Sequence, residues 1–167
     1  MRVLVIAAVI LMGCGPSSAP PADVTTEAWY KQAVGQLASA AHAADASFAA
    51  GKADDAAALI EKGEPLESQV LAVPRPTLAA MEAATDLDDL YGRMLLSNQH
   101  YEWAMFLFQK CSARWKYWQP QTGETARRMK LAQDEIAECN RRMVNEHPGG
   151  KSRATGPHHA DRKASGR

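Results

Sequence analysis

The sequence predicts an all-α fold of about five helices in antiparallel hairpins, which form a repeat-like or irregular bundle. Three observations support this prediction: β-branched residues are sparse after Val24–Thr26, long stretches are rich in alanine, and apolar residues recur at spacings of three and four. Prolines and glycines divide these stretches into segments of helical length. A chain of 167 residues also suffices for one domain with a hydrophobic core.

The first helix is predicted over residues 26–50, with Thr25 or Thr26 as its N-cap. Gly51 follows as the C-terminal cap. One face of this helix is mostly alanine, which lets a partner helix approach closely. That face comprises Trp29, Ala33, Leu37, Ala41, Ala44 and Phe48.

The second helix is predicted to begin near Ala53, with Asp54 and Asp55 in the first turn, where carboxylates interact favourably with the helix dipole. Pro65 must end, kink or restart this helix, because proline has no backbone N–H to donate. The buried stripe before the proline comprises Ala56, Leu59, Ile60 and Gly63. A second short helical piece is expected to carry Leu66, Val70 and Leu71.

The third helix is predicted over residues 76–97, with Pro76 in its first turn, and the fourth over residues 100–118. The fourth helix is apolar over two arcs, so we expect it to be central and packed on both sides. Its main stripe comprises Tyr101, Ala104, Met105, Phe108, Cys111, Ser112 and Trp115, and its second arc comprises Trp103, Phe106, Leu107 and Tyr117.

The fifth helix is predicted over residues 124–145 and completes a helical domain that spans residues 26–147. Its apolar residues form a narrow seam that faces one partner helix. The seam comprises Met129, Ala132, Ile136, Cys139 and Met143. Residues 148–167 contain five Lys or Arg and one Asp without an apolar period, which predicts a disordered basic tail.

The N-terminal residues combine a cation, an apolar run and a cysteine. Arg2 precedes an apolar run over residues 3–12, which is too short to span about 30 Å of hydrocarbon at about 1.5 Å per residue. Such a run is typical of a secretory signal peptide, here residues 1–13. The residues at the end of this segment and just after it, Leu11-Met12-Gly13-Cys14, resemble the lipobox of bacterial lipoprotein signals. Leu11, Gly13 and Cys14 match that pattern, and Met12 is the loose position.

The lipoprotein resemblance implies cleavage after Gly13, a diacylglyceryl thioether on Cys14 and acylation of the new amino group. Several acyl chains make a stable anchor, because each buried methylene contributes about 0.8 kcal/mol. Residues 14–25 then form a lipidated, flexible tether rich in proline and small residues. Gly15 stands where an inner-membrane retention signal has aspartate, which favours the outer membrane. The alternative is an ordinary cleaved signal peptide with a chance cysteine.

Two parts of the chain, within residues 34–116, share a pattern of small, glycine and apolar or aromatic residues. The pattern comprises Ala44, Gly51, Ala56 and Ile60 in the first part and Gly92, Tyr101, Ala104 and Phe108 in the second. It resembles the tetratricopeptide repeat, a family of antiparallel helix pairs. The resemblance implies a degenerate two-unit array, because Ala56 and Ala104 lie 48 positions apart where the family repeats at about 34. A generic helical bundle is the alternative.

Cys111 and Cys139 leave two outcomes open. An export signal permits a disulfide. In a simple hairpin that turns near Gln121, however, Cys139 lies about 12 Å along its helix from the residue opposite Cys111, and a disulfide needs Cα atoms within about 7 Å. The pair is therefore either a bridge in a less simple hairpin or two buried thiols.

The stretch 114–118 is the candidate binding surface, because its aromatic rings and cations suit a sugar ring or a lipid interface. The alternative is that Trp115 belongs to the core and the rest ends the helix. The candidate residues are Arg114, Trp115, Tyr117 and Trp118. No catalytic motif is present, and His158-His159 has no further ligand at metal-binding spacing. We therefore expect no enzymatic activity, no cofactor and no metal site.

Together these observations predict a lipid-anchored protein of the outer membrane that faces the periplasm and binds or scaffolds another envelope protein. The alternative function is binding of a cell-wall or envelope glycan through residues 114–118. The formal net charge is zero, which gives no reason to expect a nucleic-acid partner.

Overall fold

The computed structural model describes residues 23–146, and within this range the chain forms five α-helices, one short 3-10 helix and no β-strand. The all-α prediction is therefore confirmed. None of the helices in this range combines the length and apolar character that a membrane span requires. The predicted signal peptide, most of the tether and the basic tail lie outside the described residues. The elements are η1 (Val24–Thr26), α1 (Ala28–Ala49), α2 (Ala53–Leu71), α3 (Leu78–Ser97), α4 (Tyr101–Tyr117) and α5 (Gly123–Glu146).

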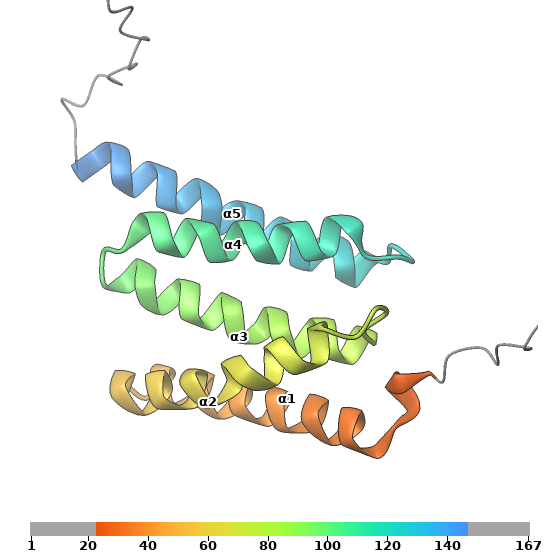
Figure 1. The fold of residues 1–167 in the computed structure, drawn as a ribbon. Coiled ribbons are helices and arrows are strands. Elements are labelled where there is room, and N and C mark those ends of the chain that lie inside the picture. Colours follow the sequence, from red (N-terminus) through yellow and green to blue (C-terminus); the bar gives the residue numbers. More distant parts are fainter. Residues whose placement is uncertain (1–22, 147–167) are drawn as a thin grey trace, which may run out of the picture.

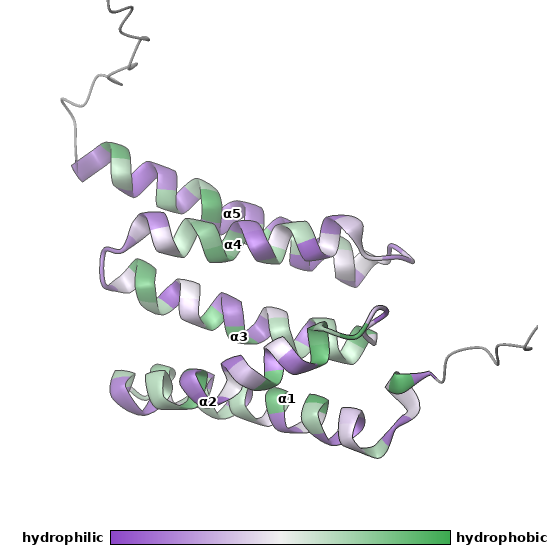
Figure 2. Cartoon of the chain, viewed as in Figure 1, coloured by the Kyte–Doolittle hydropathy of each residue, from purple (hydrophilic) through white to green (hydrophobic). Residues whose placement is uncertain are grey.

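The five helices follow one another as antiparallel hairpins (Figure 1). α3 lies between the α1–α2 pair and the α4–α5 pair, and it packs against α1, α2 and α4. α5 packs on α4. Figure 2 shows the sequence pattern behind this arrangement, because apolar stretches alternate with polar ones along each helix.

The helix ends differ in detail from the predicted caps. Thr25 and Thr26 belong to η1, which Asp23 caps by accepting a hydrogen bond from the Thr25 N–H at 3.0 Å. α1 therefore begins later, behind Glu27, which makes no side-chain capping bond. Thr77, rather than Pro76, sets the start of α3, as Thr77 Oγ1 accepts a hydrogen bond from the Ala80 N–H at 3.3 Å.

The turn between α1 and α2 follows the prediction. Gly51 has a φ of +75°, in the left-handed region that glycine adopts at low cost, and it lies just after the end of α1. α2 then begins at Ala53 with Asp54 and Asp55 in its first turn, as expected from the helix dipole.

The prediction of a separate helical piece after Pro65 is wrong, because α2 continues through the proline to Leu71. Pro65 is exposed, and so is Glu61, whose carbonyl loses its intrahelical partner and can turn to water. Buried side chains on both sides of the proline, Ile60 and Val70, hold the helix against its neighbours. In Figure 1 the second half of α2 leaves the direction of the first half and rises toward α3.

The core consists of two clusters that meet at α3. One cluster joins α1, α2 and α3, and the other joins the end of α3 to α4 and α5. Close helix contacts need small residues in both: a Cβ on Gly63 would lie 2.8 Å from Leu87 Cδ2, and a Cβ on Gly92 would lie 2.6 Å from Phe108 Cε1. The largest fully buried side chains are Trp115, Tyr30, Phe108, Leu37, Leu87, Leu90 and Val70.

Two predicted apolar faces are corrected by the structure. On α1, Trp29 is exposed and the neighbouring Tyr30 is buried instead, with its hydroxyl accepting a hydrogen bond from the Thr77 N–H at 3.0 Å. On α4 the main stripe is buried between α3 and α5, but three residues of the second arc stand in solvent. These exposed residues are Trp103, Phe106 and Tyr117.

The predicted seam of α5 faces α4 as expected. Ala132 and Cys139 are buried. Met129, Ile136 and Met143 are half-buried. Each half-buried side chain keeps one flank in water, which fits a terminal helix that contacts one partner.

Candidate functional site

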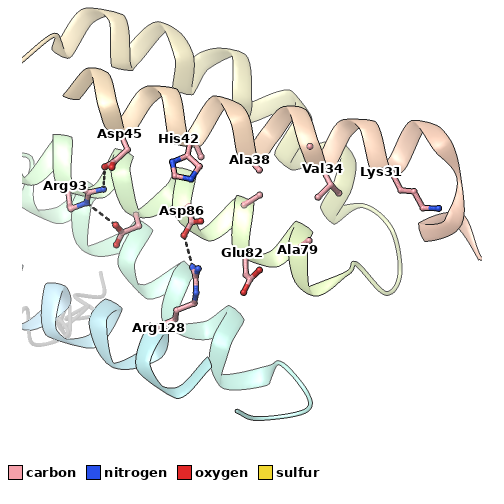
Figure 3. A pocket seen from close by; sticks show the side chains of 14 residues that line it. Lys31, Val34, Ala38, His42, Asp45, Ala79, Glu82, Asp86, Arg93 and Arg128 are labelled. Atoms are coloured by element: carbon pink, nitrogen blue, oxygen red, sulfur yellow. Dashed lines mark hydrogen bonds and ion pairs between the residues drawn. The ribbon is translucent and has the colours of Figure 1, made fainter. Parts of the chain in front are cut away.

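A groove of about 580 Å³ lies between α1 and α3, with Arg128 of α5 at its edge (Figure 3). We call it the α1–α3–α5 groove. Three helices far apart in sequence thus contribute side chains to one concavity. Its lining residues are Lys31, Val34, Gly35, Ala38, Ala41, His42, Asp45, Ala79, Glu82, Ala83, Asp86, Asp89, Arg93 and Arg128.

The floor of the groove is apolar and made of small side chains. Val34, Ala41 and Ala83 are buried there, and Ala38 is half-buried. Gly35 has no heavy atom within 4 Å of the place where a Cβ would stand, so the space above it is open. The small residues that let α1 and α3 approach each other therefore also leave room above their contact line.

Ion pairs form the rim of the groove. Arg93 binds Asp45 on α1 at 2.7 Å and Asp89 on α3 at 3.0 Å, so it ties the two helices together. Arg128 on α5 binds Asp86 on α3 at 2.7 Å, and Figure 3 shows both pairs at the edge of the hollow. Burial raises the pKa of Asp89 above its ordinary value, although the charge of Arg93 acts in the opposite direction.

Three polar side chains of the groove make no ion pair within the described residues: Lys31, His42 and Glu82. Lys31 and His42 project from α1, and Glu82 projects from α3 on the opposite side (Figure 3). Their charges and hydrogen-bonding groups are therefore available to a bound molecule, whereas those of Arg93 and Arg128 are already partnered.

A second polar cluster is buried between α2, α3 and α4. Arg114 contacts Glu67 and Asp88, and its side chain is only 9% exposed. Lys110 Nζ lies 2.9 Å from Glu67 Oε1 and 3.0 Å from Asp88 Oδ1. Burial raises the pKa of Asp88, and the charge of Arg114 opposes this shift. Asp88 is thus a buried residue of the domain core.

This cluster corrects the predicted binding surface, because the four candidate residues do not share a face. Arg114 is engaged in the interior, and Trp115 is fully buried with the Arg128 guanidinium 5.5 Å from its ring centre. Tyr117 is exposed and Trp118 is half-buried. Tyr117 has Lys116 Nζ 5.4 Å from its ring centre, but Arg114 and Trp115 are not on this exposed surface.

The two cysteines of the described range are separate, free thiols. Cys111 lies against α3, where its Sγ donates to the Thr85 carbonyl at 3.8 Å, and Cys139 lies in the cluster between α4 and α5. Burial raises the pKa of both thiols. Among residues 23–146 no group of three or more His, Cys, Asp or Glu side chains is placed to hold a metal ion.

The sequence interpretation missed the groove. Its small residues were assigned to helix packing alone, and its charges come from three helices whose alignment no local pattern reveals. The usable signal was the run of alanine and glycine on one face of residues 34–41, beside the acidic residues at 82, 86 and 89. Comparison of the chain with protein-family models, curated protein sequences and solved structures finds no match.

Proposed function

We propose that this chain is a lipid-anchored envelope protein that binds another envelope protein in the α1–α3–α5 groove. The observation that carries the proposal is the groove itself, a hollow of about 580 Å³ with an apolar floor and a charged rim. Hollows of roughly 300–1,000 Å³ with a few placed polar groups are typical of binding sites.

The chemistry of the groove favours recognition of a polypeptide. Small floor residues such as Ala38 and Ala41 admit the side chains of a partner. Lys31 on one wall and Glu82 on the other offer opposite charges to its backbone or side chains. Charged groups in such positions chiefly set specificity and association rate. The stacked antiparallel helices and the resemblance to tetratricopeptide repeats agree with this role.

The proposed anchor would raise the effective concentration of this site at the membrane. Cys14 lies nine residues before Asp23, the first described residue, and nine residues span at most about 30 Å. A domain confined to such a layer searches a small volume for membrane-bound partners. We place it at the periplasmic face of the outer membrane, on the lipobox resemblance and Gly15.

Crosslinking in membranes followed by pull-down of the mature protein tests whether a partner protein binds in the groove. Ala79→Arg places a long cation in the groove, and Ala113→Arg makes the same change on an exposed position of α4 outside it. We expect Ala79→Arg to abolish recovery of the partner and Ala113→Arg to leave it unchanged. Equal recovery with both variants would refute the groove as the binding site.

Cys14→Ser tests the anchor separately. We expect the wild-type chain to partition with membranes and to carry the mass of its acyl chains, and the variant to be soluble. Identical, unlipidated products from both chains would remove the anchor while leaving the groove result intact.

A further inference from the structure

A second depression lies over α2, α3 and α4. It consists of two hollows of about 260 Å³ and 520 Å³ that share Tyr91 and Leu107, so they form one continuous trough. We call it the α2–α3–α4 trough. The smaller hollow is lined by Ile60, Glu64, Glu67, Ser68, Leu87, Asp88, Tyr91, Leu107 and Lys110. The larger one is lined by Tyr91, Leu95, His100, Trp103, Phe106 and Leu107.

The larger hollow is an aromatic surface without a covering element in the described range. Trp103 is 67% exposed and Phe106 is 58% exposed. Leaving such rings in water is costly, because each can bury about 150–250 Å². Their faces are also favourable sites for cations, above all for the guanidinium of arginine.

The smaller hollow is acidic. Glu64 is exposed and forms no ion pair within residues 23–146, while Glu67 and Asp88 lie behind it with Lys110 and Arg114. The described part of the chain as a whole has 18 acidic and 13 basic residues. This charge disfavours an anionic membrane surface as the occupant of the trough and favours a cationic segment.

The chain itself contains a cationic segment after its last described residue. Glu146, the last described residue, accepts a hydrogen bond from the hydroxyl of Tyr101, the first residue of α4. The chain therefore leaves the domain at the end of α4 that carries Trp103. Residues 147–167 then contain five basic residues and one acidic residue. The basic residues are Lys151, Arg153, Arg162, Lys163 and Arg167.

The lengths are compatible with docking in cis. From Tyr101 to Lys110 the trough side of α4 is about 14 Å long, at about 1.5 Å per residue. Lys151 follows Glu146 by five residues, a reach of up to about 17 Å, and Arg162 follows it by 16 residues, a reach of up to about 55 Å. The first cations can therefore reach the aromatic hollow and the later ones the acidic hollow.

We infer that residues 147–167 dock along the α2–α3–α4 trough, with arginine and lysine side chains over Trp103 and Phe106 and others at Glu64. A covalently attached segment meets its site at an effective concentration in the millimolar range, so weak individual contacts suffice. Docking in cis also gives the exposed aromatic rings a cover that the described helices do not provide.

Paramagnetic relaxation in the mature chain carrying Cys14→Ser tests this inference, with a nitroxide on Ser165→Cys. We expect the amide signals of Phe106 and Lys110 to lose at least half their intensity, while that of Ser39 on α1 keeps its intensity. Replacing the four cations at 151, 153, 162 and 163 by serine should restore the signals. In a chain that carries both Trp103→Ser and Phe106→Ser, the nitroxide should broaden fewer amide signals of the trough. Trp29→Ser, which removes an exposed aromatic ring elsewhere, should leave the broadening unchanged.

Three results would overturn the inference. Broadening spread evenly over the domain would show no preferred site. Broadening that persists when the nitroxide is on an isotopically unlabelled chain mixed with a labelled one would assign the trough to a second copy. The third result is that the nitroxide broadens no trough amide, while residues 147–167 bind the chain to vesicles of three parts phosphatidylethanolamine to one part phosphatidylglycerol. That result would assign residues 147–167 to lipid binding.

Discussion

Gly92 and Gly35 provide a matched pair of substitutions with opposite expected effects on stability. Both lie inside helices, α3 and α1, so alanine at either position should gain about 0.8–1.0 kcal/mol of helix propensity. Their surroundings differ. A Cβ at position 92 would lie 2.6 Å from Phe108 Cε1 and 2.8 Å from its Cζ, whereas a Cβ at position 35 would meet nothing within 4 Å.

The magnitude follows from the required displacement. Carbon atoms pack at about 3.5–4.0 Å, so the Phe108 ring or the α3 backbone must move by about 1 Å to admit the methyl group. Phe108 is fully buried, which places the cost near the top of the usual overpacking range, about 3 kcal/mol. Gly92→Ala should therefore lower the free energy of unfolding by about 2 kcal/mol, and Gly35→Ala should raise it by about 1 kcal/mol.

Urea and thermal unfolding, followed by circular dichroism on the mature chain carrying Cys14→Ser, measure both changes. For a domain of this size, each kcal/mol of unfolding free energy shifts the melting temperature by about 3–6 °C. The melting temperature should therefore fall in Gly92→Ala and rise in Gly35→Ala. The difference between the variants isolates the contact with Phe108, because the gain in propensity is common to both. Equal increases in melting temperature would refute the close packing of α3 on α4. Phe108→Leu should lower the free energy of unfolding by less in the Gly92→Ala background than in the wild type.

Further predictions concern the charges and thiols. Arg114→Met should lower the free energy of unfolding by about 3 kcal/mol in urea titrations, because Glu67 and Asp88 are left buried with one fewer cation, and a loss below about 1 kcal/mol would contradict the buried pairing. Burial raises the pKa of Asp88, so the folded protein keeps the Asp88 carboxyl protonated to a higher pH than the unfolded chain does. The free energy of unfolding should therefore fall as pH rises from 3.8 through the raised pKa. Asp88→Asn should flatten this part of the plot of unfolding free energy against pH. The hydrogen bonds from Arg127, with those from Arg128, lower the pKa of Glu124 to about 2. The contribution of Glu124 to the free energy of unfolding should therefore be lost as pH falls from 4.5 toward 2. NMR of its carboxyl carbon should give a pKa near 2, and this pKa should rise in Arg127→Ala. Cys111 and Cys139 should resist iodoacetamide at pH 8 in the native Cys14→Ser chain and both react in guanidinium, and a mass two units lower under non-reducing conditions would instead reveal a bridge.

Local pattern predicted the helices well and their rotation less well. Segment limits depend on breakers such as Gly51 and on the spacing of apolar residues, and both are visible in the sequence. The predicted buried face of α1 was wrong by one residue at the start of the helix, because a stripe of alanines defines a face only loosely. Tyr30 rather than Trp29 turns inward, where it meets the backbone of Thr77, 47 residues away.

The candidate surfaces were harder to predict, because they depend on pairing between distant helices. Arg114 looked like a surface cation next to aromatic rings, but its partners come from α2 and α3, 47 and 26 residues earlier. Trp103 and Phe106 looked like core residues, and only the arrangement of the helices within residues 23–146 shows that these helices leave them exposed. Hydrophobic character alone cannot distinguish a buried arc from a docking face.

The attachment of α5 mainly to α4 implies that the domain does not open as one unit. α5 packs on α4 and buries only Thr125, Ala132 and Cys139, so the free energy needed to detach it should be smaller than that for global unfolding. Detachment would expose Cys139 while Cys111, held against Thr85, stays covered. The rate of alkylation at position 139 therefore reports the fraying of the last helix, and an earlier reaction there than at position 111 would mark the C-terminal end as the place where this stack begins to come apart.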